Sequence, residues 1–534
     1  MCNLHVKLGP CWHYTDGVSV KGAGFVQERL HTKDALAHVF SHADNWENFV
    51  QILKTINGFF AVVVHREDRC YAAVDRTRSI PLFYAVHENT VFLSDSPEWI
   101  QNQIGERIVD SVSLIEFLLT GYVTGFYTLD PRIHQLQAGE ALAVTVAGGE
   151  ISCHTERYYR FLTGKDEPRT LSEEELLSRL DKVTVEAIER LVIYASGRPI
   201  VVPLSGGLDS RLIAINLKRL GYGNVIAFSY GVKGNWESKT SESIARQLDL
   251  PWHFVEYSPN LWKQWYWSEE CRSYLRYASR LVSLAHLQDW PAVMELTKKR
   301  IIPSSSVIVP GHTGDFVTGG HIPIELQMRQ IYSTKDVLEA ILRHHYNLMP
   351  IETAAEHAKV NPDDIRVRLL QRLWSCFEFS GEKAVNAPEA VRLYEYWDWQ
   401  ERQAKYIVNS VRVYDFYGLD WWLPWWDKEL MEFWTLAPLE FRIDQQLYKN
   451  YVKLTQTRWN IKIREPLSLR AKRFIRKADQ TDVIKMLHSA LSKYRTPACR
   501  ILALHAAFDL KSERHMSVLG AAALAQLGFS FQEF

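Results

Sequence analysis

Short apolar segments separated by turn residues dominate the first 160 residues. This spacing is typical of hairpins in an antiparallel sheet. A further hairpin is predicted over residues 140–153, around the turn Ala147-Gly148-Gly149-Glu150. The chain therefore begins with a β-rich part. The earlier predicted strands are residues 58–64, 69–74, 82–86 and 90–93.

The hydrophobic period changes after residue 170. Residues 163–169 are charged and predict a linker, and Ser172 with Glu175 predicts a capping box for an amphipathic helix that ends near Tyr194. Strands and helices then alternate with short loops, which indicates a parallel sheet covered on both faces. From about residue 270 the pattern is mostly helical. The predicted strands are residues 199–204, 225–230 and 253–257, and the predicted helices are residues 211–220 and 238–248.

Length and composition narrow the class of protein. A chain of 534 residues predicts more than one domain, here 1–160 and 170–534. Lys+Arg and Asp+Glu both count 62, which argues against nucleic-acid and anionic-membrane partners. The seven cysteines form no Cys-x-x-Cys pair, and no apolar run is long enough to cross a bilayer. A reduced, cytoplasmic protein is expected.

The strongest chemical signal is PLSGGLDSR at residues 203–211, between a predicted strand and a predicted helix. Its glycines allow close approach of backbone N–H groups to phosphate oxygens at a helix N-terminus. Asp209 supplies an oxygen ligand suited to magnesium. No Gly-Lys-Ser/Thr follows, so the loop differs from that of ordinary ATPases. The predicted phosphate-binding residues are Leu204, Ser205, Gly206, Gly207, Asp209 and Ser210.

This segment resembles the PP-loop of pyrophosphate-releasing synthetases, and most of the chain resembles the asparagine synthetase family. DRTRSIPLFY at 75–84, FSYGVKGNWES at 228–238, GHTGDFVTGG at 311–320 and LPWWDKEL at 423–430 carry the likeness. The resemblance implies an α/β two-domain fold. Its N-terminal domain would be antiparallel and Ntn-hydrolase-like, with a glutamine-amidotransferase-like character. Its C-terminal domain would be a PP-loop domain of the adenine nucleotide α hydrolase type with a helical C-terminal part.

The resemblance also implies a chemistry. A carboxylate would attack ATP to form an acyl-adenylate with release of pyrophosphate, and an amine would then displace AMP. Asp209 and Asp315 would hold Mg²⁺, Gly311 would line the nucleotide site, and Lys449 would stabilise charge on the α-phosphate. Simpler interpretations remain open: Lys449 is a solvated surface lysine, and Asp315 caps a Gly-rich turn.

Several residues depart from the family pattern. His312 stands where the family has a glutamate that handles the amine; it is either a replacement base or a structural turn residue. Phe316 replaces an acidic position. Cys2 follows Met1 as in family glutaminases, and Glu28-Arg29-Leu30 resembles the glutamine-carboxylate segment. Other glutaminase elements are missing, which favours a remnant domain over a working glutaminase.

The substrates stay open at this stage. The carboxylate is aspartate, a sugar uronic acid or another acid, and the nitrogen comes from ammonia, glutamine or an amine on the substrate itself, as in β-lactam and lasso-peptide synthetases. The aromatic segments 262–267 and 421–426 slightly favour a sugar. A nucleotide-binding regulator without catalysis is the non-enzyme alternative. A homodimer is compatible with the sequence.

Overall fold

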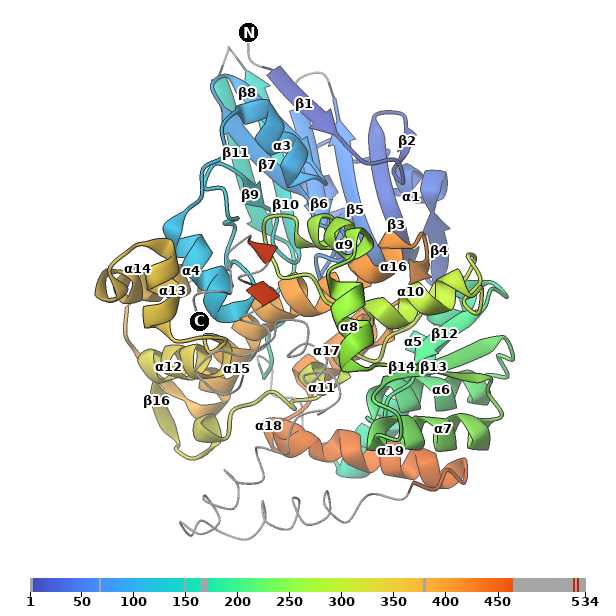
Figure 1. Cartoon of the computed structure of the whole chain (residues 1–534). Coiled ribbons are helices and arrows are strands. Elements are labelled where there is room, and N and C mark those ends of the chain that lie inside the picture. Colours follow the sequence, from blue (N-terminus) through green and yellow to red (C-terminus); the bar gives the residue numbers. More distant parts are fainter. Residues whose placement is uncertain are drawn as a thin grey trace.

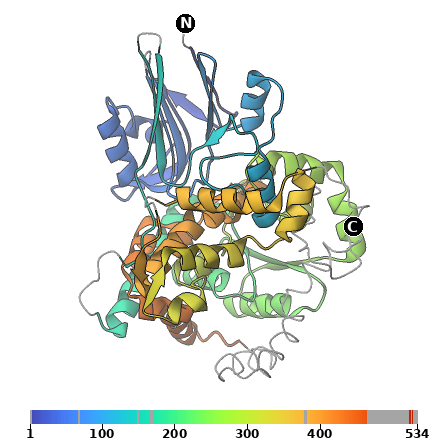
Figure 2. The same ribbon diagram turned by 90° about the vertical axis from the view of Figure 1, so that its left-hand side faces the viewer.

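The computed structural model describes residues 3–66, 69–147, 150–164, 171–377, 381–463, 522–523 and 526–527. Two stacked sheets form the N-terminal half, and helices around a parallel sheet form the C-terminal half (Figure 1, Figure 2). The predicted α/β two-domain fold is thereby confirmed. Cys2, the turn residues Gly148 and Gly149, and most of the predicted linker lie outside the described residues.

The N-terminal half is a two-sheet sandwich. One sheet has the strand order β1-β8-β7-β9, and the other has the order β11-β10-β6-β5-β3-β2, with β4 also paired to β3. The pairings are antiparallel as predicted, except that β1 runs parallel to β8. The strands are β1 (Asn3–Lys7), β2 (His13–Thr15), β3 (Val18–Val26), β4 (Arg29–Thr32), β5 (Asn57–His65), β6 (Arg69–Val74), β7 (Phe83–His87), β8 (Thr90–Ser94), β9 (His134–Gln135), β10 (Glu140–Ala147) and β11 (Glu150–Arg157).

Strand β5 is apolar from Phe59 to Val64 because both of its faces are covered there. Phe60 and Val62 pack on one face with residues of the helices α1 and α2. Phe59 and Ala61 point the other way and join the cluster that includes the second sheet. Successive side chains of a strand alternate between faces, so a fully buried strand loses the apolar–polar alternation of a half-exposed one. The helices of this half are α1 (Lys33–Val39), α2 (Trp46–Thr55), α3 (Pro97–Ile104) and α4 (Ser111–Thr120).

The C-terminal half is built on a parallel sheet with the order β14-β13-β12-β15-β18. The predicted β-α-β-α-β unit is confirmed, and the helix α5 begins with the predicted capping box between Ser172 and Glu175. A small antiparallel pair, β16 with β17, stands apart. The strands are β12 (Ile200–Pro203), β13 (Val225–Gly231), β14 (Trp252–Glu256), β15 (Val307–Ile308), β16 (Ile331–Ser333), β17 (Ala384–Asn386) and β18 (Asp420–Trp421).

Helices surround this sheet and fill the rest of the C-terminal half (Figure 1). The helices between residues 173 and 317 are α5 (Glu173–Ala195), α6 (Asp209–Arg219), α7 (Trp236–Leu248), α8 (Pro259–Tyr266), α9 (Glu269–Ser279), α10 (Trp290–Lys298) and α11 (Gly314–Val317). Beyond it come η1 (Ile324–Gln327), α12 (Thr334–His345), α13 (Ile351–Ala358), α14 (Pro362–Ser375), α15 (Ala387–Asp398), the π-helix η2 (Trp399–Ile407), η3 (Val408–Val411), α16 (Arg412–Phe416), η4 (Pro424–Trp426), α17 (Lys428–Leu436), α18 (Leu439–Arg442), η5 (Ile443–Gln445) and α19 (Gln446–Arg458).

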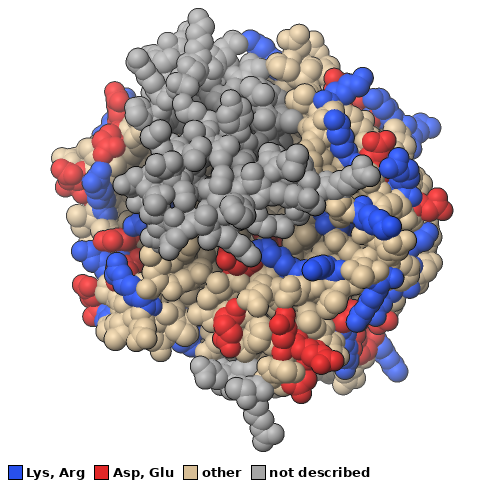
Figure 3. Space-filling model, turned by 90° about the horizontal axis from the view of Figure 1, so that it is seen from below, with Lys and Arg blue, Asp and Glu red and all other residues tan. Residues whose placement is uncertain are grey.

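No helix in the described part of the chain is long and apolar enough to span a bilayer. On the face seen from below, basic and acidic side chains are intermixed (Figure 3), in keeping with the zero net charge.

A buried ionic cluster joins the two halves. Arg190 on α5 donates to both carboxylate oxygens of Asp427, at 2.7 and 2.9 Å. Asn57 at the start of β5 donates to Asp427 at 3.0 Å and accepts from the backbone N–H of Lys428 at 2.9 Å. Glu28, on the β3–β4 turn, accepts from Arg190 at 3.0 Å. Because a buried charge without its partner is costly, this cluster holds the N-terminal sheets against the C-terminal half.

We expect Arg190→Met to lower the free energy of unfolding by about 3–5 kcal/mol, because Asp427 would remain buried without its cation. Arg219→Met is the matched control: Arg219 is paired with Asp181 near the surface, at 2.6 Å, and its loss should cost less than about 1 kcal/mol. Urea unfolding followed by tryptophan fluorescence measures both. Equal losses in the two variants would contradict the importance of the Arg190 cluster.

Candidate functional site

The PP-loop lies at the carboxyl end of β12, directly before α6. The backbone N–H of Ser205 donates to the Ser210 hydroxyl at 3.0 Å, and the N–H of Gly207 donates to the Ser205 hydroxyl at 3.1 Å. Arg211 donates to the carbonyl of Gly206 at 2.8 Å. The loop is therefore braced by its own residues, in the crevice where parallel sheets commonly bind ligands.

The second Gly-rich motif packs directly on this loop. A Cβ atom placed on Gly311 would lie 2.4 Å from the backbone nitrogen of Ser210. A Cβ atom placed on Gly314 would lie 2.5 Å from the Asp209 carboxylate carbon. These approaches leave no room for a side chain, so the motif needs glycine at both positions. The result is that Asp209 and Asp315, predicted from separate segments, lie close together.

The two carboxylates have opposite environments. Burial and the neighbouring Asp315 raise the pKa of Asp209 to about 7, although the Tyr448 hydroxyl donates to it at 2.6 Å. Desolvation also opposes ionisation of Asp315, but His321 outweighs that cost and lowers its pKa to about 2. His321 lies 3.2 Å from an Asp315 oxygen. Near neutral pH, the pair therefore holds one firmly ionised carboxylate and one that readily keeps a proton.

The donor set fits Mg²⁺ brought in with a nucleotide. The described residues contain no group of three or more His, Cys, Asp or Glu that could hold a metal ion by themselves. Mg²⁺ is usually bound by one or two carboxylates together with substrate phosphates, and Asp209 with Asp315 beside the PP-loop supplies that number. The mutual repulsion of these two carboxylates is a further reason for a cation to bind there.

Lys449 lies in the first turn of α19. Its ammonium donates to the backbone carbonyl of Asp444, and the residue is exposed. The preceding residue is Tyr448, which contacts Asp209. Gln445 donates to the Thr318 hydroxyl at 2.6 Å, so the start of α19 rests on the second Gly-rich motif. The first turn of α19 therefore lies against the site through Tyr448 and Gln445.

His312 lies deeper, beside the π-helical region. Its Nε2 atom is 2.8 Å from the Ser410 hydroxyl, and its buried Nδ1 atom has no hydrogen-bond partner among the described residues. Burial, with a smaller effect of His286, lowers the pKa of His312 to about 4. The ring is thus neutral at pH 7 and has one nitrogen available to accept a proton.

Sequence reasoning missed three residues that complete the site: Tyr448, His321 and Asp398. His321 lies 2.7 Å from Asp398 through Nδ1, and the two carboxylates raise the pKa of His321 to about 9 against the opposing effect of burial. His321 directly follows Gly320, so its place beside the motif was a usable signal. Asp398 had none, because its partner His321 is 77 residues away in the chain and no local pattern encodes such a contact.

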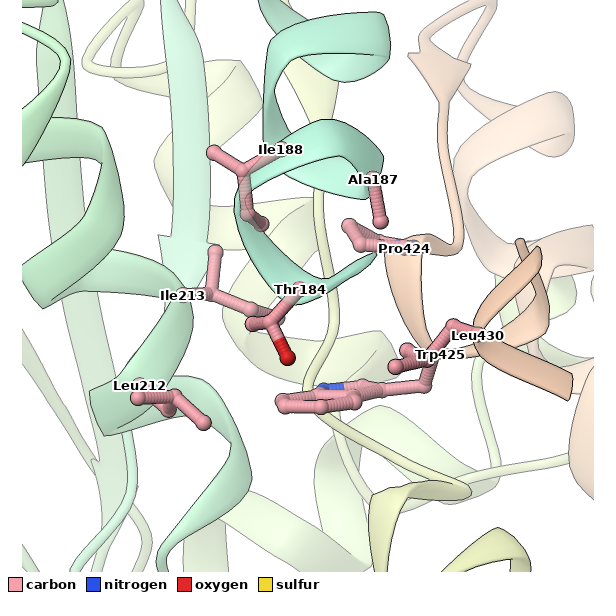
Figure 4. Close-up of a pocket in the computed structure, with 8 residues that line it drawn as sticks. All are labelled: Thr184, Ala187, Ile188, Leu212, Ile213, Pro424, Trp425 and Leu430. Atoms are coloured by element: carbon pink, nitrogen blue, oxygen red, sulfur yellow. The ribbon is translucent and has the colours of Figure 1, made fainter. Parts of the chain in front are cut away.

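The aromatic segments that slightly favour a sugar differ in exposure. The tryptophans of 421–426 are at most 9% exposed and Trp262 is 2% exposed, so these side chains pack in the core, whereas Trp267, at the end of the first segment, is 49% exposed. An apolar gap between α5, α6 and η4 is lined by Ile188, Leu212 and Trp425, among others (Figure 4). It is too narrow for a water molecule and has no charged lining residue, so it is a packing gap beside the PP-loop helix.

The glutaminase candidates are not brought together among the described residues. Strand β1 begins at Asn3, at the end of the sheets remote from the C-terminal half, where the N-terminus is marked (Figure 1). Arg29 begins β4, beside the Glu28 that contacts Arg190 of the C-terminal half. The described residues therefore show no assembled glutamine site.

These features define a protein that joins an amidotransferase-type sandwich to a PP-loop nucleotide-binding half. The asparagine synthase model matches residues 179–460, which is more than half of the chain, and a glutamine amidotransferase domain model matches residues 39–159. The chain belongs to the asparagine synthase family. The second match begins after both Cys2 and Arg29. No curated protein matches the chain.

Solved structures with a partial likeness include two NAD synthetases and an amidotransferase. An NH3-dependent NAD synthetase from Campylobacter jejuni subsp. jejuni NCTC 11168 is 16% identical with a TM-score of 0.19, over 28% of this chain and 61% of its own. A glutamine phosphoribosylpyrophosphate amidotransferase from B. subtilis is 9% identical with a TM-score of 0.18, over 45% and 72%. A glutamine-dependent NAD+ synthetase from Acinetobacter baumannii is 14% identical with a TM-score of 0.19, over 55% and 65%. The chain thus spans less than two thirds of the first of these relatives.

The raised pKa of Asp209 predicts a dependence of stability on pH. Between its ordinary pKa of 3.8 and about 7, the folded protein binds a proton that the unfolded chain has released, so this group's contribution to stability falls as pH rises. Asp209→Asn removes the effect. In metal-free buffer, the unfolding temperature of the variant relative to the parent should therefore rise from about pH 5 to about pH 8.

Glu242→Gln, on the exposed face of α7, is the control and should follow the parent at both pH values. A constant difference between Asp209→Asn and the parent across this range would show that Asp209 ionises normally in the folded protein.

Proposed function

We propose that this protein is an ATP-dependent, amide-forming ligase that activates a carboxylate as an acyl-adenylate and then transfers it to an amine. The observation that carries the proposal is the contact of Gly311 and Gly314 with the first turn of α6, because it unites the PP-loop with Asp209 and Asp315. Family membership supports the same class of reaction. The domains expected at 1–160 and 170–534 are part of this proposal.

Each residue has a role in the first step. The PP-loop N–H groups and the hydroxyls of Ser205 and Ser210 would hold the pyrophosphate that leaves. Asp209 and Asp315 would bind Mg²⁺, which neutralises charge on the departing phosphates. Lys449 would stabilise the charge that develops on the α-phosphate while the carboxylate attacks.

In the second step an amine attacks the acyl-adenylate and AMP leaves. The attacking amine must lose a proton, and a neutral imidazole can accept one. His312 is neutral, and in the tautomer whose Nε2–H donates to the Ser410 hydroxyl its Nδ1 atom would accept the proton. Aspartate, a uronic acid and an acid that carries its own amine all remain candidate substrates. The competing function is that of a non-catalytic nucleotide-binding regulator. The assembly we propose is a homodimer.

The adenylation step is tested by release of pyrophosphate with a library of carboxylates. We expect Asp209→Ala to abolish release, because a cation ligand is lost, and Lys449→Ala to lower it by about 100-fold. Lys453→Ala is the matched control, since Lys453 is also exposed and lies one turn further along α19. Parental release by Asp209→Ala would refute the PP-loop assignment, and parental release by Lys449→Ala would remove that lysine from the mechanism. A parent protein that binds ATP but releases no pyrophosphate with any acid would favour the regulator.

The nitrogen source is a separate question. We expect ammonia, or an amine on the substrate, to support product formation better than glutamine does, because several glutaminase elements of the family are missing from the sequence. Cys2→Ala should leave ammonia-dependent synthesis unchanged. Measuring glutamate release from glutamine by the parent and by Cys2→Ala checks this. Robust release by the parent that is lost in the variant would instead establish a glutamine-dependent amidotransferase.

A further inference from the structure

His321 bridges two carboxylates that come from distant parts of the chain. Its Nε2 atom is 3.2 Å from Asp315 Oδ2, and its Nδ1 atom is 2.7 Å from Asp398 Oδ2. Both ring nitrogens are therefore engaged, and the plane of the ring is fixed. The ring of Phe316 lies edge-on to it, at 5.7 Å between centroids. A histidine held at both nitrogens can transmit the position of one carboxylate to the other.

Asp398 is the fixed end of this bridge. Its side chain is fully buried at the C-terminal end of α15, and its second oxygen accepts from Gln403 at 3.1 Å. The π-helix η2 begins at the next residue and places Gln403 beside it. Single π-helical insertions are frequent at functional sites, where they redirect side chains that a regular helix would point elsewhere.

Asp315 is the adjustable end. Its side chain is 57% exposed, so nothing buries it in one orientation. Oδ1 accepts from the backbone N–H of Phe316 at 2.9 Å, and Oδ2 faces His321. Because each carboxylate oxygen has two lone pairs, one lone pair on each oxygen remains for a cation. Without His321, rotation of the carboxylate would be opposed only by the neighbouring N–H.

We propose that His321 is a positioning residue that, anchored by Asp398, orients the Asp315 carboxylate for the divalent cation that accompanies ATP. The proposal rests on the proposed function, which makes Asp315 a cation ligand. Outer partners of this kind hold a ligand in the geometry that the metal requires, and their loss weakens metal binding by about 10–100-fold.

The test measures binding of Mn²⁺–ATP to the full chain by the water proton relaxation enhancement of the bound ion. We expect His321→Asn to weaken binding about 10-fold or more, because the asparagine amide mimics Nδ1 and does not reach Asp315. His321→Gln should keep most of the affinity, since its amide reaches the Nε2 position. Asp398→Asn, which removes the anchoring charge, should weaken binding severalfold.

His344→Asn is the matched control, because His344 also faces a carboxylate, Glu325 at 2.8 Å, but at a site away from Asp315. It should bind Mn²⁺–ATP like the parent. The unfolding temperatures of all variants distinguish a structural role from a positioning role. If His321 served stability alone, His321→Asn and His321→Gln would have lower unfolding temperatures but would bind Mn²⁺–ATP with parental affinity. That result would overturn the proposal.

The remaining outcomes are also decisive. If the parent does not bind Mn²⁺–ATP, the proposed function fails and the role of His321 fails with it. If the parent binds and both His321→Asn and Asp398→Asn bind equally well, the positioning role is overturned while the proposed function stands. If His321→Asn does not fold, Asp398→Asn decides: weaker binding supports the proposal, and parental binding overturns it.

Discussion

The candidate site depends on one backbone contact between two glycine-rich segments. Gly311 and Gly314 lie so close to the first turn of α6 that a Cβ atom at either position would overlap Ser210 or Asp209. This approach places the second motif across the PP-loop and puts two carboxylates side by side. Like charges held together in a partly buried place repel each other, so the fold stores a local electrostatic cost in the absence of a cation.

The residues around Asp209 and Asp315 affect the ionisation of the two carboxylates in opposite ways. Asp315 faces His321 and stays ionised, whereas Asp209 is buried against Asp315 and Tyr448 and keeps its proton up to about pH 7. Environments that push the pKa values of two neighbouring acids apart are a common feature of reactive sites. A divalent cation that binds here would displace the proton of Asp209, so cation affinity and pH are coupled through that residue.

The local sequence pattern was sufficient to predict the strand and the helix on either side of the PP-loop. The strand expected at 199–204 is β12, and the helix expected at 211–220 is α6, because an apolar run, a Gly-rich turn and a helical period occur in direct succession. The pairing of His321 with Asp398 spans 77 residues, and that of Tyr448 with Asp209 spans 239. No local pattern encodes such contacts, since they arise only when helices from distant segments pack on one sheet.

The N-terminal half supports the candidate site through hydrogen bonds, independently of any reaction that this half carries out. Asp75 organises the turn after β6, where it accepts from both the backbone N–H and the hydroxyl of Thr77 at 2.7 Å. That turn receives hydrogen bonds from the C-terminal half: the Trp399 indole donates to the Arg76 carbonyl at 3.0 Å, and Arg412 donates to the Ser79 carbonyl at 2.6 Å.

These two donors flank the residues that support the site. Trp399 follows Asp398, which anchors His321, and Arg412 lies two residues after Ser410, which contacts His312. The backbone of η2 and η3 is therefore held from outside by the N-terminal sheets and from inside by the candidate catalytic groups. A chain that lost glutamine hydrolysis would still need this turn, because the helix that orients both histidines is fastened to it. The packing of the N-terminal domain against the site is therefore required whether or not that domain hydrolyses glutamine.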